Sequence, residues 1–319
     1  MSSSPEVTFS IKDAGIMLEP QLGMSMDQLV KTSRLAEELG FGYLFRSDHL
    51  LPTNDKRGID SPECWTSLGA IAASTSKLRF GPLVSPIGFR NPALLAKMAC
   101  TLHSYSKGRL QLAIGAGWYE SEYRSHGYSF PGFSERLAQF REALEIITAL
   151  VREGRADIDG KYFSAHTDCY PRPHGDLHLI IGARTKSLVR LAGRRADEWN
   201  FFNLGDEPYQ ELWGVLNAAA EGRKVEVSMM TPYLIAKNQS ELEASAKLQA
   251  SKLGQSLSPK EVVERLNARR APCGTVSDFV EQVRGVVESG VQKVYFQTLV
   301  PENIGMIELL ADTLKRGVG

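Results

Sequence analysis

The stretch GRLQLAIGAGWYESEYRSHG, residues 108–127, predicts a buried strand that ends in a glycine turn. Arg109 to Ile114 is a short run of apolar residues and strand formers, and Gly115-Ala116-Gly117 stops it. Two glycines around one small residue let a flat or bulky group approach the backbone closely, because neither carries a Cβ atom. The aromatic and acidic residues from Trp118 to Tyr123 then predict the wall of a ligand site at the carboxyl end of the strand.

Charge and cysteine content restrict the possible partners. The chain has 319 residues, with 37 basic and 37 acidic, so the formal net charge is zero and neither nucleic acid nor a membrane surface is expected as a partner. A signal-peptide pattern and a run of about 18 apolar residues are both missing, so a soluble protein that is not exported is expected. The cysteines lack CxxC spacing, which argues against disulfides and zinc and favours a reducing, cytoplasmic setting. They are Cys64, Cys100, Cys169 and Cys273.

Strand and helix patterns alternate along the chain. Each strand pattern is followed by at least one amphipathic helix pattern, and no shift in composition marks a linker, so a single domain over residues 1–319 is expected. Eight strands are predicted, over 7–17, 41–46, 78–84, 109–114, 177–181, 199–203, 225–236 and 293–299. This count favours a closed (β/α)8 TIM barrel, an α/β fold, over a doubly wound sheet.

One segment interrupts the alternation, from Gly154 to Asp176. It is rich in Gly, Pro, His, Tyr and Asp and too long for an ordinary connection, so we predict an insertion that is a mobile surface loop. His166, His174 and His178 lie in it or just after it. They lack metal-like spacing with the nearby Asp and Cys residues, and no metal site is expected.

The carboxyl ends of the barrel strands are expected to carry the functional residues, since these ends meet at one mouth of a TIM barrel. In chain order they are Asp48-His49, Ser85, Gly115 to Glu122, Gly182 to Thr185, Asn200 to Asn203 and Gln297-Thr298. We therefore expect these segments to form a ring around a single site.

Ionisable residues in this ring allow acid–base chemistry. Asp48 could orient the imidazole of His49, which exchanges a proton near neutral pH, but the two could also make only local hydrogen bonds at a strand end. Glu120 and Glu122 could form an acid–base pair at the pocket wall. First-turn carboxylates are favoured by the helix dipole, and Glu122 is interpreted as one of these.

The segment from Gly182 to Thr185 has the features of an anion site. Small residues allow close approach, and a helix start supplies free backbone N–H groups beside a hydroxyl and a guanidinium. The alternative is that Gly182 only turns the chain and Thr185 only caps the following helix.

Over nearly its whole length the chain resembles the luciferase-like monooxygenase superfamily of flavin- and deazaflavin-dependent oxidoreductases. The resemblance lies in FGYLFRSDHLLP (41–52), FRNPALLAKMACTLHSYSKGRLQLAIGAGWYESEYRSHGYSFP (89–131) and IIGARTKSLVRLAGRRADEWN (180–200). It implies a barrel with an insertion, a flavin-type ring across the carboxyl end, a homodimer, and hydride transfer to or from a small organic substrate.

The resemblance also implies roles for individual residues. Asp48 and His49 stand where deazaflavin enzymes place ring-contacting and proton-handling residues, and residues 82–85 match a segment that supports the ring, often through a non-proline cis peptide. Residues 182–185 match the phosphate-binding segment, although Ala183 and Arg184 make it less glycine-rich than is common. The expected cofactor contacts are Asp48, Leu83, Val84, Ser85, Gly115, Trp118, Ser121, Gly182, Ala183, Arg184 and Thr185.

The Asp-His-Leu form of residues 48–50 favours the deazaflavin F420 over FMN as the cofactor. His49 is expected to handle the proton that accompanies hydride transfer, with Asp48 fixing its tautomer or contacting the ring. Two alternatives remain open. One is an FMN-dependent monooxygenase that uses reduced flavin and O2, and the other is a cofactor-binding protein without turnover.

Overall fold

The computed structural model describes residues 9–53, 58–205 and 208–318. The first predicted strand begins at Val7, so its first two residues lie outside the described part of the chain. The sequence also predicts a helix over 207–221, and its first residue, Glu207, likewise lies outside the described part.

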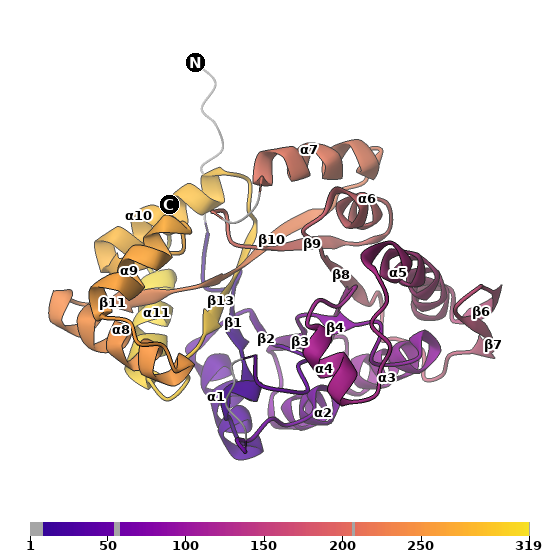
Figure 1. Cartoon of the computed structure of the whole chain (residues 1–319), viewed down its shortest axis with the longest axis horizontal. Coiled ribbons are helices and arrows are strands. Elements are labelled where there is room, and N and C mark those ends of the chain that lie inside the picture. Colours follow the sequence, from indigo (N-terminus) through magenta and orange to yellow (C-terminus); the bar gives the residue numbers. More distant parts are fainter. Residues whose placement is uncertain (1–8, 54–57, 206–207, 319) are drawn as a thin grey trace.

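A parallel sheet of nine strands forms the centre of the fold (Figure 1). Its order is β3-β2-β1-β13-β10-β9-β8-β5-β4, and every pair in it is parallel. The strands are β1 Ala14–Leu18, β2 Tyr43–Arg46, β3 Arg79–Pro82, β4 Ser85–Pro86, β5 Gln111–Gly115, β8 His178–Gly182, β9 Glu198–Phe202, β10 Glu226–Pro232 and β13 Lys293–Thr298.

The sheet closes between β3 and β5. The Phe80 N–H donates to the carbonyl of Arg109 at 3.1 Å, and Phe80 and Leu110 form a parallel bridge. β3 and β4 are two parts of one barrel strand, divided at the cis peptide between Leu83 and Val84. The nine strands of the sheet therefore correspond to the eight strands of a closed barrel. The predicted (β/α)8 TIM barrel is confirmed.

Helices surround the barrel, as Figure 1 shows. They are α1 Met26–Leu39, α2 Cys64–Ser74, α3 Pro92–Tyr105, α5 Phe133–Thr148, α6 Lys186–Arg195, α7 Tyr209–Ala220, α8 Gln239–Leu253, α9 Pro259–Ala268, α10 Val276–Glu288 and α11 Ile304–Lys315. Each of these ten helices contributes buried apolar side chains to the main hydrophobic core. Short helical turns, η1 Pro20–Leu22, α4 Glu120–Ser125 and η2 Ala149–Glu153, complete the described helices.

The segment predicted as a mobile loop is instead an antiparallel hairpin. β6 Arg155–Asp159 pairs with β7 Ser164–Asp168, and the hairpin projects at one edge of the molecule in Figure 1. The loop prediction was wrong because most of the hairpin's side chains are polar and exposed. Only alternate small residues, Ala156 and Ala165, are buried against the core, and this is a weak period-2 signal.

The predicted seventh strand, 225–236, is also corrected. It divides into β10 and a short strand, β11 Leu234–Ala236, which leaves the barrel and pairs with β12 Cys273–Thr275 in a separate two-stranded sheet. The Pro272-Cys273-Gly274 sequence predicts a break, but Cys273 and Gly274 belong to β12. Pro232 explains the division, since it lacks the N–H that would continue the ladder.

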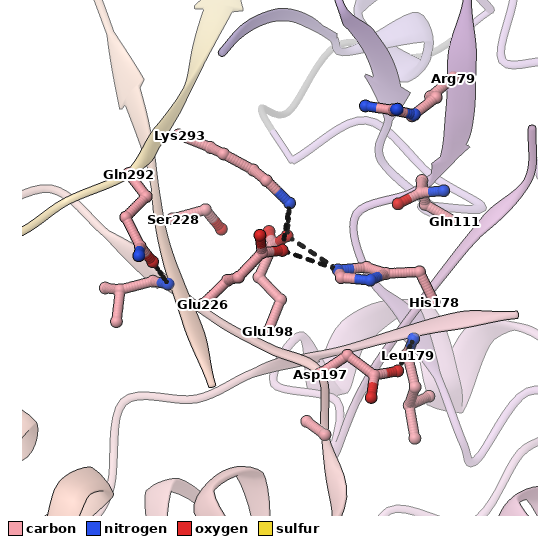
Figure 2. A network of polar contacts seen from close by, with 12 residues as sticks. Arg79, Gln111, His178, Leu179, Asp197, Glu198, Glu226, Ser228, Gln292 and Lys293 are labelled. Atoms are coloured by element: carbon pink, nitrogen blue, oxygen red, sulfur yellow. Dashed lines mark hydrogen bonds and ion pairs between the residues drawn. The ribbon is translucent and has the colours of Figure 1, made fainter. Parts of the chain in front are cut away.

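A polar network lies inside the barrel at the amino ends of its strands (Figure 2). Glu198 is fully buried, and its Oε2 accepts a hydrogen bond from Lys293 Nζ at 2.7 Å while Oε1 accepts one from the Tyr295 hydroxyl at 2.7 Å. Lys293 also bonds Glu226 at 2.7 Å, and His178 Nε2 lies 3.1 Å from Glu198 Oε2. Burial opposes the charge of Glu198, but Lys293 and His178 outweigh it and hold its pKa at about 2.

This network contains three possible metal ligands. The spacing of the histidines in and near the insertion did not reveal them, because two of the three residues lie on later strands. His178, Glu198 and Glu226 offer one ligand atom each, all within 4.8 Å of one another. The Lys293 ammonium bonds both carboxylates, so the chain supplies the neutralising positive charge itself. We therefore interpret this end of the barrel as a closed, charge-paired layer.

Candidate active site

The carboxyl ends of the barrel strands open on a cavity of about 950 Å³. Strand ends from around the barrel line it, and α8 and α9 form a further wall. The predicted site residues that line it are Asp48, His49, Leu83, Val84, Gly115, Trp118, Gly182, Ala183, Arg184 and Thr185. Segments that are far apart in the sequence thus meet at one mouth of the barrel, as the spacing of the strand ends predicted.

Two predicted residues do not line this cavity. Ser85 is fully buried behind it, and its hydroxyl donates to Asp48 Oδ2 at 2.6 Å. Ser121 is exposed on α4 and is not among the residues that line the cavity. Glu120 is also on the surface of α4, where it pairs with Arg124, so the idea of an acid–base pair with Glu122 does not agree with the structure.

Glu122 lies in the first turn of α4, as predicted, but its carboxylate is also the partner of His49. Its side chain is 1% exposed, and its Oε1 lies 2.9 Å from His49 Nδ1. Its Oε2 accepts a hydrogen bond from the backbone N–H of Leu50 at 2.9 Å. Glu122 is the third residue of the short helix α4, and its carboxylate is directed at the loop after β2 rather than at solvent.

This contact fixes the tautomer of His49. A carboxylate only accepts, so Nδ1 carries the hydrogen and Nε2 keeps its lone pair in the neutral ring. Burial disfavours the charged ring, but the hydrogen bond and charge of Glu122, helped by Glu19 and Asp48, outweigh it and raise the pKa of His49 above the usual 6.5. His49 lines the cavity and is therefore placed to exchange a proton there.

Asp48 does not bond His49, so the prediction that it fixes the His49 tautomer was wrong. Its Oδ2 accepts from Arg90 Nη1 at 2.7 Å and from Ser85, and its Oδ1 accepts from Arg90 Nη2 at 3.2 Å. Ser85 in turn accepts from Trp65 Nε1 at 3.0 Å, and Arg90 also contacts Glu63. Sequence reasoning missed Arg90 because nothing local links it to residue 48.

The side chain of Val84 explains why residues 115 and 182, both expected to contact the cofactor ring, are glycines. A Cβ added to Gly115 would lie 2.5 Å from Val84 Cγ2, and one added to Gly182 would lie 2.7 Å from Val84 Cγ1. Val84 follows the cis peptide at Leu83, in the segment where the family resemblance implies one. The glycines therefore admit a valine side chain that projects into the cavity between two strands.

The start of α6 faces the same cavity. Ala183 is held by two bonds, from its N–H to the Asn200 carbonyl at 3.0 Å and from Trp199 Nε1 to its own carbonyl at 2.9 Å. Thr185 occupies the N-cap position, but its hydroxyl makes no capping hydrogen bond. The alternative in which this hydroxyl only caps the helix is therefore not what the structure contains.

Glu19 is a cavity residue that sequence reasoning missed. It directly follows β1, and its carboxylate accepts from Gln21 Nε2 at 2.6 Å and from Gln297 Nε2. The signal available in the sequence was its place at the carboxyl end of the first strand. Trp118 adds an aromatic wall: it is 68% exposed, and its ring centroid lies 5.7 Å from that of His49 in an edge-to-face arrangement.

A family model described as luciferase-like monooxygenase matches residues 7–293 of this chain. The chain belongs to the luciferase-like monooxygenase family. The match covers most of the barrel, including every strand end that lines the cavity up to β10. None of the described helices is long and apolar enough to cross a membrane.

Curated relatives match over part of their length. The chain is 38% identical over 191 residues to the F420-dependent glucose-6-phosphate dehydrogenase of Beutenbergia cavernae, covering 59% of this chain and 56% of that one. It is 34% identical over 174 residues to the enzyme of the same name from Nocardia farcinica, covering 53% and 51%. The matched part is thus about half the length of these relatives.

Solved structures match over almost the whole chain. Monooxygenase RslO1 from Streptomyces bottropensis superposes with a TM-score of 0.81 at 21% identity, covering 95% of this chain and 98% of that one. The coenzyme F420 dependent tetrahydromethanopterin reductase from Methanopyrus kandleri gives 0.74 at 21% identity, covering 97% and 98%. At these identities the likeness establishes the shared fold.

Proposed function

We propose that this chain is an oxidoreductase that transfers a hydride between the deazaflavin F420 and a carbon atom of a small organic substrate. The observation that carries the proposal is His49, whose Nδ1 is fixed by buried Glu122 while the ring lines the cavity beside Val84. A redox ring needs such a proton-handling group at its edge. The curated relatives, described as F420-dependent dehydrogenases, support the choice of cofactor.

The residues present fit a ring cofactor with a phosphate-bearing tail. Val84 and the glycines at 115 and 182 would support the ring, and Trp118 would bound it on the side of α4. The start of α6, from Gly182 to Thr185, would receive the phosphate, because its N–H groups and the positive end of the helix dipole favour an anion. When bound, the deazaflavin supplies a hydride acceptor or donor.

The chain's own contribution is the proton. In the oxidation of an alcohol, neutral His49 takes the hydroxyl proton at Nε2, and Glu122 stabilises the imidazolium that results. Asp48 bonds Arg90 and Ser85, and these contacts keep the loop after β2 in place. In the reverse direction protonated His49 returns the proton, and its raised pKa favours this form near neutral pH.

Cofactor titration of the purified protein tests the proposal. We expect F420 to bind more tightly than FMN, and an alcohol substrate to reduce bound F420 without oxygen. The alternative is an FMN-dependent monooxygenase, for which product formation would require both reduced FMN and O2. Binding of FMN alone, or of neither cofactor, would refute the F420 assignment, and binding without any hydride exchange would favour a non-catalytic carrier.

We also propose that the protein forms a homodimer, as the family resemblance implies, that it is cytoplasmic, as its cysteines suggest, and that it folds as a single domain, since no linker interrupts the strand–helix alternation. The described cysteines are all free and buried, which is compatible with a reducing compartment. Light scattering of the holoprotein in solution tests the dimer, and a monomeric mass across a concentration series would contradict it.

A further inference from the structure

We infer that Glu19 selects the substrate: it binds a second hydrogen-bond donor, a hydroxyl or an ammonium, on the carbon next to the one that is oxidised, and it excludes an anionic group there. The inference rests on the proposed function, because it concerns the alcohol that reacts beside His49. Neither the curated relatives nor the family assignment decides which groups flank the reacting carbon in this chain.

The backbone places Glu19 beside the reacting site. β1 lies next to β2, and the Ser47 N–H donates to the Leu18 carbonyl at 3.1 Å, so Glu19 and the Asp48-His49 pair leave adjacent strand ends. On its other side β1 pairs with β13, which brings Gln297 within reach. Both Glu19 and His49 line the cavity, and the charge of Glu19 acts on the His49 ring.

Neutral amides hold the Glu19 carboxylate in a fixed orientation. Gln21 Nε2 donates to Oε2 at 2.6 Å, and Gln297 Nε2 donates to Oε1. Gln21 itself is 1% exposed, and its Oε1 accepts from the Ser47 hydroxyl at 2.6 Å. Because a carboxylate only accepts, the Nε2 end of the Gln21 amide must face Glu19. Each carboxylate oxygen keeps a further lone pair for a ligand.

The other two carboxylates among the described cavity residues are paired with basic side chains, which distinguishes Glu19 from them. Asp48 bonds the Arg90 guanidinium, and Glu122 bonds His49. In the described part of the chain, the Glu19 carboxylate is hydrogen-bonded only to the two amides. A substrate that displaces water from Glu19 must therefore bring a donor, because an uncompensated carboxylate is costly to desolvate.

The consequence is a preference that can be measured with four matched alcohols. Propan-2-ol has no second donor, propane-1,2-diol adds a hydroxyl, 1-aminopropan-2-ol adds an ammonium, and lactate places a carboxylate at the same position. Hydrogen bonds to charged groups contribute enough to change affinity by about 10- to 100-fold. We expect the amino alcohol and the diol to bind ahead of propan-2-ol, and lactate to bind last.

The experiment measures the affinity of the F420-loaded protein for each alcohol, and kcat/KM wherever turnover occurs. In Glu19→Gln, which keeps the shape of the side chain, we expect the affinity for the amino alcohol to fall about tenfold or more relative to that for propan-2-ol, and the affinity for lactate to rise relative to it. Glu120→Gln is the matched control, since it changes a surface glutamate at the same end of the barrel and should leave the order intact.

The two proposals fail in different ways. If the protein does not bind F420, the proposed function fails. If F420 binds but the wild type shows no preference among the four alcohols, or binds none of them, the role of Glu19 is refuted. An order of affinities that is the same in the wild type and in Glu19→Gln refutes the role of Glu19 as well. Comparison of the amino alcohol with the diol shows whether charge or hydrogen bonding contributes more to the preference.

Discussion

The two ends of the barrel use the same kinds of residue in opposite ways. At the amino ends, Glu198 is buried with Lys293 and His178 against it, and Lys293 also bonds Glu226 (Figure 2). At the carboxyl ends, His49 is fixed on one nitrogen only, and Glu19 is held by neutral amides. A carboxylate whose charge is cancelled within the fold contributes to stability, whereas one that still lacks a cation is available to a ligand.

This difference also explains where water is needed. The amino-end network replaces water by ammonium and phenol donors, so it can close. In the carboxyl-end cavity, Glu19 and His49 keep hydrogen-bonding positions that water or a ligand must fill. Substitutions at the two ends should therefore separate activity from stability.

Removal of the His49 imidazole should have the largest effect on activity. We expect His49→Ala to lower kcat for alcohol oxidation by about 10²- to 10⁴-fold, because a positioned acid–base group is lost. The affinity for F420 should change little. His166→Ala, on the exposed hairpin, is the matched control, and equal loss in both variants would contradict the role of His49.

Removal of the Lys293 ammonium should have the largest effect on stability. Lys293→Met leaves buried Glu198 without its main counter-charge, so we expect about 3–5 kcal/mol of unfolding free energy to be lost. Denaturant titration measures it. Lys186→Met removes an ion pair of half-exposed side chains and should cost no more than about 1 kcal/mol. Similar losses in both variants would show that the amino-end network is not a stabilising layer.

The Glu122 carboxylate should be visible in the pH dependence. Oxidation requires neutral His49, so the rate rises as pH passes through the raised pKa of this ring, above 6.5. Glu122→Gln removes the negative charge that raises this pKa, and we expect the rising limb to move to lower pH. A limb that stays in place, measured as kcat/KM against pH, would mean that Glu122 does not act on His49.

Crowding at Val84 should give a smaller effect, confined to cofactor binding. Gly182→Ala places a methyl group 2.7 Å from Val84 Cγ1, so the valine must move out of its position in the cavity. We expect the affinity for F420 to fall by about tenfold, as for a loss of roughly 1.4 kcal/mol. Gly214→Ala on α7 meets no atom within 4 Å and should leave binding unchanged.

The sequence predicted the barrel and the place of its site because these depend on local patterns. Apolar strand runs and the glycine turn at 115–117 mark the strand ends, and in a parallel barrel these ends must meet. The pairing of side chains across the mouth depends on tertiary contacts instead. His49 and Glu122 are 73 residues apart, so no local spacing distinguishes Glu122 from an ordinary first-turn carboxylate.

The errors have the same origin. The hairpin at 155–168 was missed because most of its side chains are polar, and its strands are defined by pairing with each other. The sequence predicts that Asp48 pairs with its neighbour His49. Its actual partner, Arg90, comes from a different strand end, which the sequence does not place beside it. Contacts of this kind are decided by which loops the closed barrel brings together.

The most direct test of the central claim is the reduction of protein-bound F420 by an alcohol without oxygen, followed as the loss of F420 absorbance in the wild type and in His49→Ala. We predict stoichiometric reduction in the wild type, with a rate that increases with pH, and a rate lower by two or more orders of magnitude in the variant at unchanged F420 occupancy. Equal rates in the two proteins, or reduction that requires O2, would contradict the account.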